Sequence, residues 1–179
     1  GAALSAQLDR RGAILDLGAI DRSLREVAEH FASINRHLDS PREWLDDHMV
    51  DHLMSGYAFI DSLIEHKVDL LAFGQLRLLL ELNALVLCGQ DEQVRLEAVG
   101  HLKATDKHFF DNVDGGIRDV IEWHALHAHE SAWLRAGGVY IRMLAEPELF
   151  IEGNHRTGAL VMSYVLVRAG RPPCVLTVD

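Results

Sequence analysis

Residues 75–88 read QLRLLLELNALVLC, and apolar side chains fall on nearly every side of the helix this stretch would form. Such a pattern predicts a central helix that is buried all round. Gly89 follows directly and is expected to end the helix. Because Arg77, Glu81 and Asn83 interrupt the stretch, it is too short and too charged to span a bilayer.

The rest of the chain also shows helical periodicity. Apolar residues between Ile20 and Leu38 recur at steps of three and four, which indicates one face of an amphipathic helix that ends by Pro41. Ser40-Pro41-Arg42-Glu43 is typical of a helix start. Further helices are expected at about 41–56, 57–66, 91–110, 117–129, 131–144 and 154–169, with a loop over 145–153. The predicted fold class is all-α, with at most a small β-hairpin near the extended tail CVLTVD.

Length and composition favour one domain spanning residues 1–179. Lys and Arg number 17 and Asp and Glu 27, so the formal charge is 17 − 27 = −10. This balance argues against a polybasic surface for nucleic acid or for an anionic membrane. Cys88 and Cys174 are expected to be small buried residues in a reducing compartment. No signal peptide is seen, so a cytoplasmic location is expected. The apolar tail suggests that the natural chain continues.

The segment FIEGNHRT, residues 150–157, lies where the predicted loop meets the last helix. Gly153 permits an unusual backbone conformation, and Asn154 is a favoured helix-cap residue. The free N–H groups of the first turn favour an anion, and Arg156 can fork onto phosphate oxygens. Glu152 could hold Mg²⁺ beside a di- or triphosphate. The alternative is that Asn154 only caps the helix, while Glu152 and Arg156 form a surface pair.

Residues 150–176, FIEGNHRTGALVMSYVLVRAGRPPCVL, resemble the core of the Fic (Fido) family. That family's motif reads His-x-Phe-x-Asp/Glu-Gly-Asn-Gly/Lys-Arg-x-x-Arg, often followed by Gly-x-Pro-Pro. The positions in register are Phe150, Glu152, Gly153, Asn154, Arg156 and the segment 170–173. The resemblance implies a helical fold that transfers AMP from ATP to a Ser, Thr or Tyr hydroxyl of a protein.

The same resemblance implies roles for individual residues. Glu152 would hold Mg²⁺. Gly153, Asn154 and Arg156 would bind the phosphates of ATP or another nucleotide, with Thr157 in the same turn.

The chain also departs from the motif. The position of the family's catalytic His is Glu148, or Glu146 if the loop carries two extra residues. His155 replaces the second glycine, and Ala159 replaces the last Arg. Glu148 and His155 are therefore the candidate bases. One reading is a transferase with a non-standard base, and the other is a catalytically degenerate binding or regulatory module. A homodimer is left open.

Two histidine clusters stand outside this segment. His48 and His52 recur at i, i+4 with Asp47 and Asp51 beside them. This spacing is compatible with Zn or Fe, although a solvated face or a pocket edge is the favoured interpretation. A second group, His124, His127 and His129, precedes the motif helix and is interpreted in the same way, with contact to the motif's cleft as an alternative.

Overall fold

The computed structural model of the chain describes residues 14–37, 45–111 and 115–178. Its helices are α1 (Leu17–Asn35), α2 (Asp47–Glu65), the 3-10 turn η1 (Phe73–Gln75), α3 (Leu76–Cys88), α4 (Glu92–Glu97), α5 (Val99–Asp111), α6 (Gly116–Leu126), α7 (Ala132–Met143) and α8 (Asn154–Arg168). These ranges contain no strand, so the all-α prediction is confirmed and the hairpin is not found there. None of the described helices is long and apolar enough to cross a membrane.

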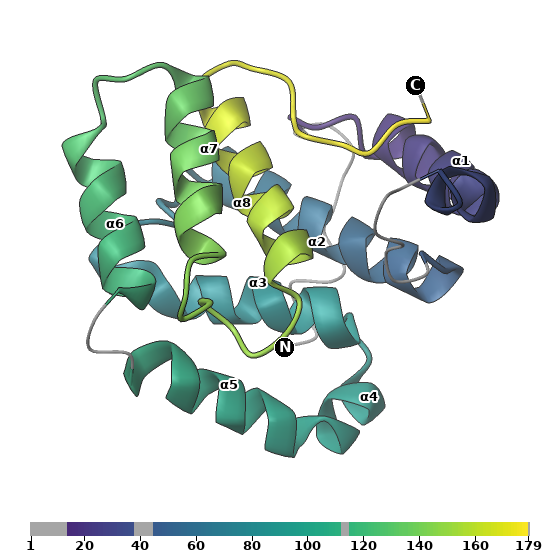
Figure 1. Cartoon of the computed structure of the whole chain (residues 1–179), viewed down its shortest axis with the longest axis horizontal. Helices are drawn as coiled ribbons and strands as arrows, with labels where there is room; N and C mark the ends of the chain where they lie inside the picture. Colours follow the sequence, from purple (N-terminus) through teal and green to yellow (C-terminus); the bar gives the residue numbers. More distant parts are fainter. Residues whose placement is uncertain (1–13, 38–44, 112–114, 179) are drawn as a thin grey trace.

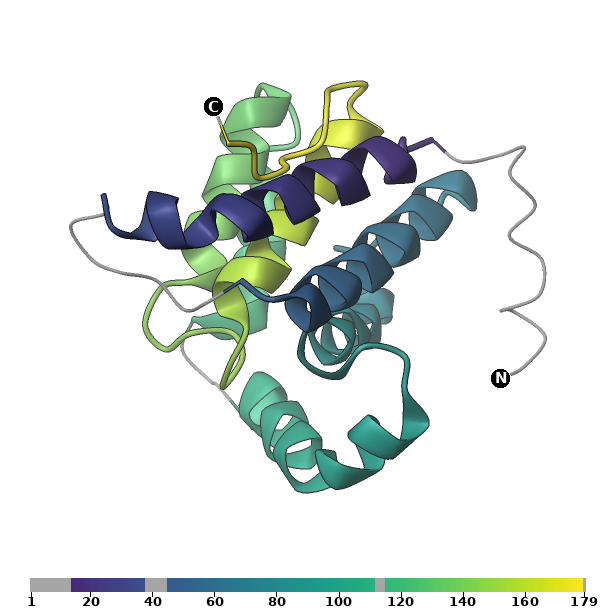
Figure 2. The same ribbon diagram turned by 90° about the vertical axis from the view of Figure 1, so that its right-hand side faces the viewer.

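Helix α3 lies at the centre of the arrangement, as its sequence predicts (Figure 1). Leu79, Leu82 and Val86 are completely buried in it. Helices α2 and α8 pack on α3, and α4 and α5 also contact it. Helix α7 packs between α6 and α8. Helix α1 packs against α2 at an angle (Figure 2). The start of α8 therefore lies on α3, close to the connection that leads from α7.

Helix α2 differs from the prediction at both of its expected boundaries. The expected start at residues 40–43 lies outside the described residues. Residues 45 and 46 are not helical, and the Asp46 carboxylate accepts a hydrogen bond from the Met49 amide at 2.8 Å. This side-chain cap defines the start of α2. The helix also runs through Gly56 without a break, because this glycine allows close packing against Leu160 of α8.

The segment predicted as one helix over 91–110 is two helices, α4 and α5, which are divided at Ala98. The tail after α8 is extended but forms no strand among the described residues. Its Cys174 amide donates to the Ser163 hydroxyl at 2.9 Å, and its carbonyl accepts from Tyr57 at 2.6 Å. Only the backbone of Cys174 makes these contacts, and the residue itself is exposed. The prediction that both cysteines are buried is therefore wrong for Cys174 and confirmed for Cys88.

Candidate functional site

The residue directly before helix α8 is a glycine in a left-handed conformation. Gly153 has φ of +75° and ψ of 15°, and no side chain caps the helix. Asn154, the expected cap, is instead the first residue of the helix. Since the first N–H groups of an α-helix have no intrahelical acceptor, the first turn of α8 offers backbone donors at the positive end of the helix dipole.

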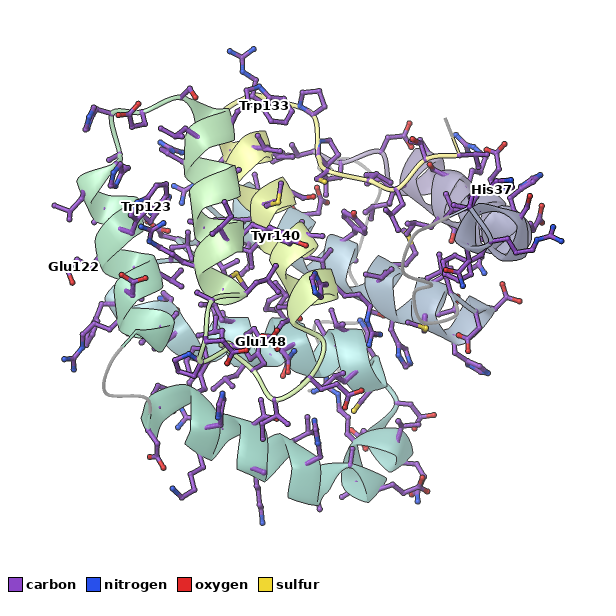
Figure 3. All side chains as sticks on the ribbon, in the orientation of Figure 1. His37, Glu122, Trp123, Trp133, Tyr140 and Glu148 are labelled. Atoms are coloured by element: carbon purple, nitrogen blue, oxygen red, sulfur yellow. The ribbon has the colours of Figure 1, made fainter. Side chains whose placement is uncertain are left out.

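The Asn154 side chain is directed back onto the loop before the helix. Its Oδ1 accepts from the Phe150 amide at 2.8 Å, and its Nδ2 donates to the Phe150 carbonyl at 2.7 Å and to Glu148 Oε2 at 2.9 Å. The residue is only 4% exposed. Asn154 therefore shapes the loop, and it holds the Glu148 carboxylate beside the start of α8 (Figure 3).

Asn83 of α3 supports the same turn from the opposite side. Its Nδ2 donates to the Glu152 carbonyl at 2.9 Å and to Thr157 Oγ1 at 3.1 Å. Thr157 is completely buried, so its hydroxyl serves this internal contact instead of lining the accessible start of the helix. Sequence reasoning missed the role of Asn83, although an amide within a mostly apolar helix was the available signal.

Arg156 extends from the first turn of α8 toward the end of α3. Its Nη1 lies 3.4 Å from the Val86 carbonyl oxygen, and the residue is half-buried. His52 of α2 also lies at the end of α3, where a Cβ on Gly89 would meet its ring. Burial, the neighbouring His48 and the Arg156 charge lower the pKa of His52. Of the pair His48 and His52, His52 thus lies at the edge of the site, while His48 is exposed.

Glu152 is exposed on the other side of the turn. Its Oε2 lies 3.7 Å from His101 Nε2 on α5, and the two form an ion pair only when His101 is protonated. The alternative of a Glu152–Arg156 surface pair is not found in the described part of the chain. No group of three or more His, Cys, Asp or Glu residues in the described ranges is arranged to hold a metal. A Mg²⁺ ion at Glu152 would need a ligand's phosphate oxygens and water to complete its coordination.

His155 is exposed at the start of α8, where its Nδ1 lies 3.0 Å from the Tyr140 hydroxyl. The second histidine group lies elsewhere. His127 stacks on Trp123 at 4.2 Å between ring centroids, and α7 separates α6 from α8 (Figure 1). This group therefore does not line the start of α8.

Comparison of the chain with models of protein families, with curated protein sequences and with solved structures finds no match. The resemblance of residues 150–176 to the Fic motif accordingly stays a resemblance of sequence.

Proposed function

We propose that the start of α8 binds the phosphate groups of a nucleotide such as ATP, and that the protein is a Fic-like binding module. The observation that carries this proposal is the first turn of α8, which follows Gly153, has no side-chain cap and carries Arg156. A helix start of this kind combines backbone donors with a favourable dipole for an anion. The guanidinium adds a charge that can pair with two phosphate oxygens.

The neighbouring carboxylates decide which form of the ligand is favoured. Glu148 and Glu152 both lie next to the turn, and a bare triphosphate there would be repelled by them. A Mg²⁺ ion between Glu152 and the phosphates removes part of this repulsion. We therefore expect the Mg²⁺ complex of ATP to bind more tightly than ATP alone.

Binding is tested by titration calorimetry with ATP, GTP and pyrophosphate, each with and without Mg²⁺. Arg156→Ala should weaken binding by about 10- to 100-fold, since a charged hydrogen bond is worth roughly 1.5–3 kcal/mol. Arg171→Ala is the matched control, because it removes the same charge from an exposed residue beyond the opposite end of α8. Lack of binding by all three compounds, or an equal effect of both variants, would contradict the proposal.

A second candidate is transfer of a nucleotidyl group, which the contact between Tyr140 and His155 favours. In this step a hydroxyl oxygen attacks the α-phosphorus, the bond to pyrophosphate breaks, and a base accepts the hydroxyl proton. His155 is accessible for that role, whereas the Glu148 carboxylate already accepts from Asn154.

Transfer is tested with ATP labelled at the α-phosphate, with a search for label on added proteins and on the chain itself. Loss of label in His155→Ala, with retention in Glu148→Gln, would assign the base to His155. Tight ATP binding without any label would support the binding module alone.

A further inference from the structure

An open groove that the proposed phosphate site does not use lies where η1 and the start of α3 meet the end of α5 and the start of α6. Its volume is about 600 Å³, which is within the range of sites for small molecules. Three aliphatic residues form part of the lining. Ile117 is buried, while Leu76 and Ile121 are half-buried. The groove shares no residue with the turn at the start of α8.

Two phenylalanine side chains line the same groove and are exposed to solvent. Phe73 of η1 is 79% exposed, and Phe110 at the end of α5 is 45% exposed. The ring of Phe110 meets the ring of Phe109 edge-on, with 5.0 Å between their centroids, so this wall is already held in place. Aromatic rings contribute large contact areas and favour other rings in stacked or edge-to-face geometry. The lining therefore favours a ligand that carries an aromatic ring.

The guanidinium of Arg77 is accessible in this groove and is only partly used. The side chain is 76% exposed, and its Nη1 donates to Asp106 Oδ1 at 2.9 Å. No described residue accepts a hydrogen bond from its Nε or Nη2. Because Arg77 Cζ lies 5.3 Å from the centre of the Phe110 ring, these two donors lie beside the aromatic wall. A guanidinium can donate to both oxygens of one carboxylate.

The charges along the groove also favour an anion. Arg118 lines it, is exposed, and forms no ion pair with a described residue. Glu122 is the acidic residue of the lining, and it lies at the outer edge of α6 (Figure 3). Two guanidinium groups thus face one carboxylate, in a chain whose formal charge is −10. A carboxylate ligand gains from this arrangement, whereas an ammonium ligand is repelled by both arginines.

We propose that this groove binds a small aromatic carboxylate. The ring of the ligand packs against Phe73 and Phe110, and its carboxylate accepts hydrogen bonds from Arg77. A second copy of the chain is a poorer occupant, because two chains of charge −10 repel each other. This site is independent of phosphate binding at α8.

The proposal is tested with three probes that separate the ring from the charge. The first is 2-naphthoate. The second is 2-naphthamide, which has the same rings without the charge, and the third is decahydro-2-naphthoate, which has the charge without aromatic rings. Binding is followed by the methyl NMR signals of Leu76, Ile117 and Ile121 in the full chain. We expect 2-naphthoate to shift these signals to saturation and each of the other two to bind about fivefold more weakly, as loss of one charged or one aromatic contact implies.

Variants assign the binding to the groove. Arg77→Gln and Phe73→Ala should each weaken 2-naphthoate binding about fivefold, and both residues are exposed enough for the fold to be retained. Glu122→Gln removes the opposing charge and should strengthen binding roughly twofold. Arg22→Gln is the matched control, because it removes the same charge from an exposed position on α1, on the opposite side of the molecule from α6 (Figure 1).

Arg156→Ala should leave 2-naphthoate binding unchanged, which separates this site from the phosphate site. If Arg156→Ala weakens binding and Arg77→Gln does not, the probe occupies the start of α8 and the proposal is overturned. Three further results would also overturn it. One is the absence of methyl shifts with 2-naphthoate up to its solubility limit, and another is equal binding of 2-naphthoate and 2-naphthamide. The third is a change of the same methyl signals with protein concentration alone, which would show that a second copy covers the groove.

Discussion

Asn154 Nδ2 donates a hydrogen bond to Glu148 Oε2 at 2.9 Å. An alignment of the sequence with the Fic motif without gaps would place Glu148 at the position of the motif's His, and this contact keeps the Glu148 carboxylate beside the start of α8. A negative charge at that place repels an anionic ligand, so removing the charge should increase the affinity for such a ligand.

Glu148→Gln should therefore strengthen binding of the Mg²⁺ complex of ATP by roughly three- to tenfold, since the interaction between two solvent-screened charges at a protein surface is worth about 1 kcal/mol. The amide oxygen of Gln can still accept from Asn154, so the loop is retained. Titration calorimetry measures the change. Glu146→Gln, in the same loop but exposed, serves as the control and should have a smaller effect. Weaker binding in Glu148→Gln would show that the carboxylate takes part in holding the ligand.

Asn154→Ala should lower the free energy of unfolding by about 2–4 kcal/mol. The substitution removes three hydrogen bonds and leaves the buried Phe150 amide without its acceptor. Urea unfolding followed by circular dichroism measures the effect. His155→Ala, at the adjacent exposed position, is the control and should cost much less. Similar losses in both variants would mean that the Asn154 contacts contribute little to stability.

Replacing each of the two adjacent glycines of α7, Gly137 and Gly138, with alanine should change the stability of the protein in opposite directions. A Cβ at Gly138 would overlap the Trp123 ring, so Gly138→Ala should destabilise the protein by about 1–3 kcal/mol. A Cβ at Gly137 meets nothing within 4 Å. Gly137→Ala should therefore stabilise it by roughly 0.5–1 kcal/mol through helix propensity. Thermal unfolding of the two variants compares them directly. Equal melting temperatures would contradict the packing of α6 on α7.

Protonation of His52 should make stability depend on pH. Burial and the neighbouring His48 hold its pKa below the ordinary value of 6.5, so the unfolded chain binds this proton more readily than the folded chain does. The contribution to stability is complete above about pH 6.5 and is lost as the pH falls through the lowered pKa of the folded state.

Urea unfolding at several pH values, with His52→Gln beside the wild type, measures this contribution. The variant should lose less stability between neutral and acidic pH than the wild type. His48→Gln removes only a neighbouring charge and should keep most of the dependence. Identical slopes for the wild type and His52→Gln would show that His52 titrates normally.

The sequence predicted the elements that depend on local chemistry. The central helix over 75–88, the helix predicted over 131–144 and the loop-to-helix boundary at 153–154 were each readable, because periodicity and glycine act within a few residues of the chain. The boundary predicted between residues 56 and 57 is wrong, although glycine has a low helix propensity. In the folded chain the missing side chain of Gly56 instead admits Leu160 from a distant helix.

By itself, the sequence determined an acidic, all-α chain with a helix that follows Gly153, with Glu152 in the preceding loop and Arg156 in the first turn of the helix. Tertiary structure alone decided which groups surround that helix start. Asn83, His52 and His101 come from α3, α2 and α5, and their approach depends on packing between helices far apart in the chain. Local patterns carry no information on such contacts, because these are set by the shape of the assembled core.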